Sequence, residues 1–271
     1  MNKDKYLIVI DLDGTLFKTV SDYDKYSTEV LKELSKDHII VIATGRPFRS
    51  SKPDYDILGL TSPIINYNGC LTFNPKDSNY PKMMHTISKE DLFRFIELNK
   101  EYIINVFCEI EDDIYVNEVN DEIYYYLHAD GGIVHEGDLT QILPNNPHGA
   151  MVFLKPNTSH IVSQNVINNF DGRLKFRSWE QSHFEFCELY DPYISKGTYI
   201  RDIQTYYGID KAHTICIGDG VNDLEMFDEA SIKVSMANGK SELKQKANYI
   251  TKSIDESGVG VFLKHFFKHK R

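Results

Sequence analysis

The sequence lacks the features that mark membrane, secreted and nucleic-acid-binding proteins. No apolar run is longer than about five residues, which excludes a membrane-spanning helix. The first apolar stretch is broken by Asp11, so we expect no signal peptide and a cytoplasmic protein. Lys and Arg total 30 against 40 Asp and Glu, a net charge of −10, which argues against a large basic surface for a phosphate backbone. We therefore predict neither a membrane nor a nucleic acid as a partner.

Cysteine is also scarce. The four cysteines are Cys70, Cys108, Cys187 and Cys216, and no two of them have C-x-x-C spacing. A zinc site or a disulfide framework would need closer or paired cysteines. We expect buried, reduced thiols.

The hydrophobic pattern at the start of the chain indicates a parallel α/β sheet. Residues 5–10, 39–43 and 64–67 form short β-branched runs that predict buried strands. Residues 28–35 have the apolar spacing of an amphipathic helix. From residue 194 the same rhythm returns, with strands expected at 213–217, 232–236 and 248–251 and helices at 196–207, 223–230 and 240–247.

The pattern between these two stretches is different. Residues 74–82 are polar with two prolines and predict a linker. Segments 88–118 and 158–189 each indicate one helix followed by two strands, while 120–146 suggests a helix and then irregular structure. Such an insert, rich in antiparallel hairpins, is typical of a separate α+β domain.

The predicted fold class is therefore α/β, and the 271 residues suit about two domains. We expect a Rossmann-like parallel-sheet core from residues 1–78 and 190–271. An α+β cap domain, residues 79–189, is inserted into it.

Three loops of this core carry polar residues directly after predicted parallel strands: 11–15, 44–46 and 218–223. Ligands of open α/β sheets bind at the carboxyl ends of the strands, where these loops converge. Four carboxylates are expected there: Asp11, Asp13, Asp219 and Asp223. They repel one another unless a cation lies among them, and oxygen ligands without Cys or His favour magnesium. Glycines in the loops let backbone N–H groups approach an anion, so the edge suits phosphoryl chemistry.

These three loops, together with residues 195–197, resemble the four motifs of the haloacid-dehalogenase-like (HAD) hydrolase superfamily. The matching residues are DLDGTL (11–16), TGR (44–46), SKG (195–197) and GDGVNDLEM (218–226). The Asn68-Gly69 loop, the large insert and DESGV (255–259) resemble Cof-type phosphatases of subclass IIB. The resemblance covers essentially the whole chain and implies a cap of the C2B type. One small departure is Met236-Ala237-Asn238, where the family often has Gly-Asn after the methionine.

The resemblance implies a role for each matching residue. Asp11 would be the nucleophile, and Asp13 the general acid and then the general base. Magnesium would be held by Asp11, the backbone carbonyl of Asp13 and Asp219, with Asp223 orienting the site. The phosphate oxygens would be bound by the Leu12 N–H, Thr44, Gly45, Lys196 and Asn222. We expect Lys196 at a solvent-accessible edge of the sheet, at the start of a helix.

Arg46 has two interpretations. It either reaches a phosphate or sugar of the substrate, as a substrate-binding residue, or it forms a structural ion pair.

The predicted function is that of a Mg²⁺-dependent phosphoric monoester hydrolase. It would act on a small phosphomonoester, such as a sugar phosphate, nucleotide or cofactor phosphate, through a phospho-aspartate. A sugar-phosphate mutase would keep the same four motifs and stays open as an alternative. A non-catalytic binding module would be expected to have lost Asp11, Asp13 or Lys196, and none is lost.

Overall fold

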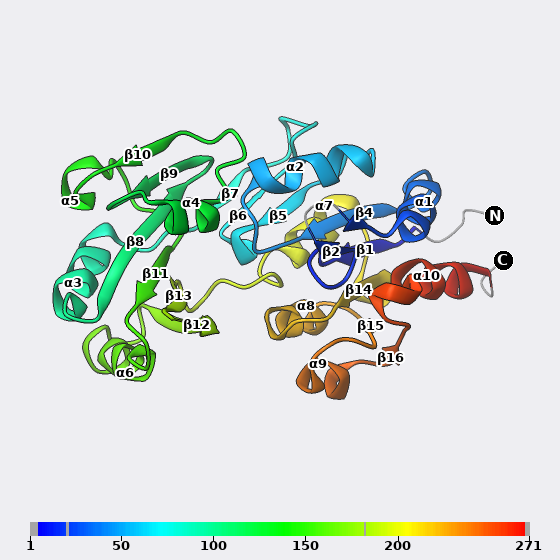
Figure 1. The fold of residues 1–271 in the computed structure, drawn as a ribbon. Helices are drawn as coiled ribbons and strands as arrows, with labels where there is room; N and C mark the ends of the chain where they lie inside the picture. The colour runs from blue at the N-terminus through cyan, green and yellow to red at the C-terminus, as the bar shows by residue number, and fades with distance from the viewer. Residues whose placement is uncertain (1–4, 20–21, 182, 269–271) are drawn as a thin grey trace. The chain divides into compact units, whose positions relative to one another are not determined.

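The computed structural model describes residues 5–19, 22–181 and 183–268 and divides the chain into two compact units (Figure 1). Unit 1 comprises Met1–Arg46, Ser51–Met83 and Ile194–Arg271; unit 2 comprises Pro47–Ser50 and Met84–Tyr193. Unit 2 covers most of the segment 79–189 that we expected as the cap, and it also includes Pro47–Ser50 and residues 190–193, while residues 79–83 belong to unit 1. Its role as a cap stays a prediction.

Unit 1 is built on an eight-stranded sheet in the order β16-β15-β14-β1-β4-β5-β6-β7. The strands are β1 (Leu7–Ile10), β4 (Ile39–Ala43), β5 (Ile64–Asn66), β6 (Leu71–Phe73), β7 (Met83–Met84), β14 (Thr214–Gly218), β15 (Ile232–Ser235) and β16 (Tyr249–Ile250). All pairs from β16 to β5 are parallel, and β6 runs antiparallel to β5. The predicted α/β class with a parallel-sheet core is confirmed.

Apolar side chains cover both faces of this sheet. In β1, Leu7 and Val9 belong to a cluster that includes Ile203 and Phe227 from flanking helices. The alternate residues, Ile8 among them, are equally buried. Strands buried on both faces have continuous Val, Ile and Leu runs, which is why these short segments were predictable.

The helices of unit 1 lie between its strands in the sequence, except α10, which follows the last strand. They are α1 (Lys25–Leu34), α2 (Phe48–Ile57, whose first residues count with unit 2), α7 (Ile200–Tyr207), α8 (Leu224–Asp228), α9 (Ser241–Lys246) and α10 (Gly258–Lys268). Shorter elements are the pair β2 (Phe17–Thr19) and β3 (Asp22–Tyr23), and the 3₁₀ turns η1 (Tyr67–Gly69), η2 (Lys211–His213), η3 (Val221–Asp223) and η4 (Ile254–Glu256). Over the described ranges of the whole chain, no helix combines the length and the apolar character needed to cross a bilayer.

The direction of the chain through the sheet reverses between β1 and β14. Strands β4 and β5 extend the sheet on one side of β1, and β15 and β16 extend it beyond β14. Ile10 pairs with Ile217, and the Asp11 N–H donates to the Ile217 carbonyl at 3.0 Å. The loops that follow β1 and β14 therefore emerge side by side, at the switch point where such sheets bind ligands.

Unit 2 has its own six-stranded sheet in the order β10-β9-β8-β11-β13-β12. The strands are β8 (Ile103–Ile110), β9 (Asp113–Val116), β10 (Val134–Glu136), β11 (Ala150–Leu154), β12 (Lys175–Gln181) and β13 (Glu185–Tyr190). Its helices are α3 (Lys89–Asn99), α4 (Asp121–Leu127), α5 (Leu139–Ile142) and α6 (Ser159–Asn169). The described pairs are antiparallel except β9 with β10.

The repeat predicted in the insert is confirmed. One helix and two strands occur as α3-β8-β9 and again as α6-β12-β13. Phe95 of α3 and Val162 of α6 share one buried cluster, while Phe107 and Phe153 belong to a second cluster with Leu127 of α4. The strands therefore have apolar residues on both faces.

Several elements were not predicted. Helix α2 was missed because Pro53 lies inside it and most of its residues are polar. The segment 120–146, read as a helix and irregular structure, also contains β10 and α5. The helix expected over 196–207 begins only at Ile200.

Candidate active site

A buried group of three charged side chains lies at the centre of the site, entirely within unit 1. Lys196 Nζ lies 2.6 Å from Asp11 Oδ1 and 2.7 Å from Asp223 Oδ1. The Lys196 side chain is only 1% exposed. The expectation of a solvent-accessible lysine at a helix start is therefore wrong, because Lys196 belongs to a tight turn before α7.

The turn that carries Lys196 lies directly against the loop after β5. A Cβ atom on Gly69 would stand 2.1 Å from the Ser195 carbonyl oxygen, and Gly69 has φ +106°. Only glycine permits both this approach and this backbone conformation. The close packing of the two loops explains how the sequence buries a lysine at the edge of a sheet.

Asp223 organises the loop after β14. Its Oδ2 accepts hydrogen bonds from the backbone N–H groups of Asp219 (3.0 Å) and Gly220 (2.9 Å), while Oδ1 pairs with Lys196. Asp223 is fully buried. Both carboxylate oxygens thus have strong donors, as a buried charge requires.

Asp219 lies beside the loop after β1. Its Oδ1 accepts a hydrogen bond from Thr15 Oγ1 at 3.2 Å. A Cβ on Gly14, which has φ +81°, would lie 2.3 Å from Asp219 Oδ2. The Leu12 side chain is buried, and its carbonyl accepts from the Thr15 N–H at 3.2 Å. Asn238, which follows the departure from the family pattern at Ala237, donates to the Gly14 carbonyl at 2.8 Å and so holds the same loop.

The carboxylates suit a divalent cation. One carboxylate oxygen from each of Asp11, Asp219 and Asp223 lies within 4.8 Å of the others. Burial raises the pKa of Asp11 well above its usual range and the charge of Asp223 raises it further, while Lys196 lowers it. Burial and Asp223 also raise the pKa of Asp219. One ammonium group does not neutralise three carboxylates, so the donor set fits a hard cation in both charge and chemistry.

The Asp13 side chain lies outside this cluster. It is exposed, and its carboxylate accepts two hydrogen bonds from Arg46, of which Nε to Oδ2 is 2.8 Å and the second joins Nη2 to Oδ1. Arg46 Nη1 also donates to Asp54 Oδ2 at 3.1 Å. Arg46 thus forms ion pairs with Asp13 and Asp54, in agreement with the structural one of the two roles considered for it. Asp54 was not predicted as a site residue, because the helix that carries it was missed.

The other predicted phosphate-binding residues lie on neighbouring loops. Thr44 is buried, and its Oγ1 accepts a hydrogen bond from the Arg46 N–H at 3.1 Å. Asn222 Nδ2 donates to Asn68 Oδ1 at 3.0 Å, and a Cβ on Gly45 would lie 3.3 Å from the Asn68 side chain. Asn68, to which the sequence analysis gave no role, therefore connects the loops after β4 and β14.

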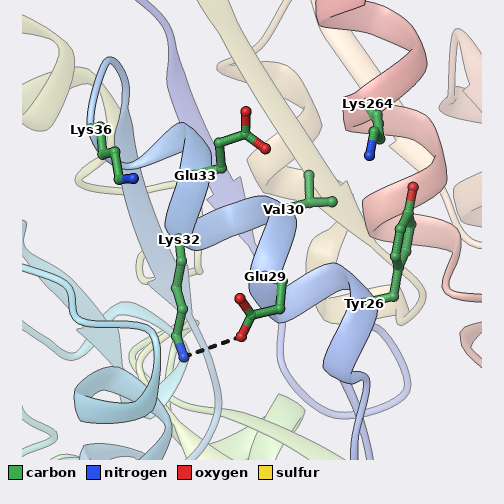
Figure 2. Close-up of a pocket in the computed structure, with 7 residues that line it drawn as sticks. All are labelled: Tyr26, Glu29, Val30, Lys32, Glu33, Lys36 and Lys264. Carbon is green, nitrogen blue, oxygen red and sulfur yellow. Dashed lines mark ion pairs between the residues drawn. The ribbon is translucent and has the colours of Figure 1, made fainter.

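A separate hollow of about 300 Å³ lies on α1 and α10 (Figure 2). Its lining residues are Tyr26, Glu29, Val30, Lys32, Glu33, Lys36 and Lys264. Charges of both signs alternate there, and Glu29 pairs with Lys32 at 3.6 Å. None of the predicted site residues is among its lining residues.

Comparison with known proteins decides the family. The family model described as haloacid dehalogenase-like hydrolase matches residues 8–263. The chain belongs to this family. The resemblance noted from the motifs is therefore confirmed for a HAD-like hydrolase.

Relatives of known description align with nearly the whole chain. A 5-amino-6-(5-phospho-D-ribitylamino)uracil phosphatase of Bacillus subtilis, YitU, is 29% identical, with 98% of this chain and 99% of the relative covered. A second phosphatase of the same description and organism, YwtE, is also 29% identical, with 94% and 96% covered. A solved HAD subclass IIB sugar phosphatase shares the fold, with a TM-score of 0.77, 22% identity and 97% and 99% coverage. The predicted enzyme class is confirmed: this HAD-like hydrolase has named phosphatases as full-length relatives.

The buried lysine generates a stability prediction. Lys196→Ala should lower the free energy of unfolding of this hydrolase by about 3–5 kcal/mol at pH 7 without metal, since two buried carboxylates lose their partner. The loss should shrink toward pH 5. Burial and Asp223 raise the pKa of Asp11, and Lys196 lowers it, so removal of Lys196 lets the folded variant bind protons at a higher pH than the folded wild type and regain part of the lost stability as pH falls. Denaturant unfolding at both pH values measures this.

Lys252→Ala is the matched control. Lys252 forms an exposed pair with Glu256 at 3.0 Å, and its loss should cost less than about 1 kcal/mol. Equal, small losses for the two variants would contradict the importance of the buried lysine.

Proposed function

We propose that the chain is a Mg²⁺-dependent phosphatase that hydrolyses a small phosphomonoester through a phospho-aspartate on Asp11. The observation that carries this proposal is the bridge formed by Lys196 between Asp11 and Asp223, with Asp219 beside them. This arrangement supports a role for Asp11 as the nucleophile, for Lys196 as a fixed positive charge and for the carboxylates as ligands of a cation. That combination suits stabilisation of a transferring phosphoryl group.

In the first step a carboxylate oxygen of Asp11 attacks phosphorus, and the bond from phosphorus to the leaving-group oxygen breaks. Asp13 donates a proton to that oxygen, so the alcohol departs neutral. In the second step Asp13 accepts a proton from water as the water attacks the phospho-aspartate. The bond from Asp11 to phosphorus then breaks and inorganic phosphate leaves.

The remaining residues bind and orient. Magnesium would be held by Asp11, Asp219 and the backbone carbonyl of Asp13, and it would neutralise charge between the carboxylates and the phosphate. Asp223 keeps Lys196 and the loop after β14 in place. The phosphate oxygens would be bound by the Leu12 N–H, Thr44, Gly45, Lys196 and Asn222, while Arg46 holds the Asp13 carboxylate.

The two Bacillus subtilis relatives suggest the first substrate to test. Both are named for 5-amino-6-(5-phospho-D-ribitylamino)uracil, and both align with this chain over nearly its whole length. We therefore take the phosphate ester of a primary alcohol, with this compound as its first example, as the proposed substrate class. Selection of the substrate by unit 2 stays a prediction.

Metal removal tests the proposed site. Chelation should abolish phosphate release, and added Mg²⁺ should restore it, because several carboxylates and a phosphate dianion otherwise repel one another. Calcium should support turnover poorly, because its looser coordination suits the in-line geometry less well than octahedral magnesium. Full activity in the metal-free protein would contradict the proposal.

Leaving groups test the role of Asp13. Asp13→Ala should slow phosphorylation of Asp11 far more by a sugar phosphate than by p-nitrophenyl phosphate, whose phenolate leaves without a proton. Hydrolysis of the phospho-aspartate should also be slow in Asp13→Ala. The aryl phosphate should therefore give a burst of about one phenolate per active site, followed by slow turnover. A rapid-mixing time course measures both steps.

Asp11→Ala is the control for that experiment and should give no burst. Equal slowing of the first step with both substrates would reject Asp13 as the general acid. A burst that survives in Asp11→Ala would reject Asp11 as the nucleophile.

A further inference from the structure

One buried carboxylate near the site has no part in the mechanism described so far. Asp54 lies in α2 and is 4% exposed. Its Oδ2 accepts a hydrogen bond from Arg46 Nη1 at 3.1 Å. Burial raises the pKa of Asp54 to about 6, while the positive charge of Arg46 lowers it and Asp13 raises it. A charge that is costly to bury is retained here, next to a residue of the site.

Arg46 is shared between this carboxylate and Asp13. Its Nε and Nη2 donate to Asp13, and its Nη1 donates to Asp54. The guanidinium is planar, so a carboxylate bound at one edge fixes the direction in which the other edge points. The Arg46 side chain is 12% exposed, which limits the water available to replace a lost partner.

The backbone of Arg46 is held separately. Its carbonyl accepts hydrogen bonds from Asn66 Nδ2 at 2.9 Å and from the Tyr67 N–H at 3.3 Å. A change at Asp54 should therefore alter the side chain of Arg46 without displacing the loop after β4.

We propose that Asp54 is a positioning residue, which acts through Arg46 to hold the Asp13 carboxyl group where it can protonate the leaving group. The inference rests on the proposed role of Asp13 as the general acid.

The test is the dependence of kcat/KM on the leaving group, since kcat/KM reports the steps up to departure of the alcohol. Asp54→Asn keeps the shape of the side chain and removes its charge. With glucose 6-phosphate its kcat/KM should fall about tenfold, less than the roughly hundredfold or more that a general acid contributes, because Asp54 acts on Asp13 only through Arg46. With p-nitrophenyl phosphate it should stay within about twofold, because that leaving group needs no proton. Asp54→Ser, which leaves room for water, should show the same change in the ratio.

Asp56→Asn is the matched control. Asp56 lies two residues further along α2, is more exposed, and pairs with Lys52 and Lys76. Both kcat/KM values should stay at the wild-type level.

The Asp13→Ala variant separates the two ideas. If Asp13→Ala is sensitive to the leaving group while both Asp54 variants slow the two substrates equally, or not at all, the inference is overturned and the proposed function stands. If Asp13→Ala itself shows no such sensitivity, the proposed role of Asp13 fails and the inference about Asp54 falls with it.

Discussion

A single buried ammonium group holds the site together. Lys196 Nζ contacts Asp11, which follows β1, and Asp223, which follows β14. It therefore joins the loops after the two parallel strands between which the strand order reverses. Without Lys196, the buried carboxylates of Asp11 and Asp223 would lie close together with no positive charge between them. Proteins avoid such uncompensated buried charges. Three features support the contact made by Lys196. Gly69 lets its loop approach Ser195, Gly14 leaves room for the Asp219 carboxylate, and two backbone N–H groups donate to Asp223. The site is therefore a product of charge balance as much as of chain topology.

The strand-end residues were predictable because a parallel sheet brings successive carboxyl ends to one edge. Asp11 and Asp219 follow short Val and Ile runs, and the pairing of Ile10 with Ile217 makes them neighbours. The burial of Lys196 was not predictable in this way. It depends on a contact between Gly69 and Ser195, which are far apart in the sequence and belong to loops without periodicity. Asp54 was not predicted because α2 itself was not predicted. Pro53 and the polar residues around it give this segment the sequence pattern of a loop.

The charged groups of the site form two sets with different surroundings. Lys196 and the carboxylates it contacts are buried, where a fixed charge acts strongly and water competes little. Asp13 is exposed, and it is held by Arg46 rather than by the buried cluster. This difference matches the chemistry proposed for them, since a nucleophile benefits from a fixed position and a group that exchanges protons with alcohol and water needs access to both. In our proposal, Arg46 and Asp54 fix the position of the Asp13 carboxyl group.

Phosphorylation of Asp11 during turnover can be measured directly. The protein is mixed with p-nitrophenyl phosphate in the presence of Mg²⁺ and quenched in acid within milliseconds, and its peptides are analysed by mass spectrometry. We expect one added phosphoryl group on the peptide that contains Asp11. This group should be more abundant in Asp13→Ala than in the wild type, and absent in Asp11→Ala. Phosphate on another residue, or steady turnover with no trapped phosphoryl group in Asp13→Ala, would contradict the proposed mechanism.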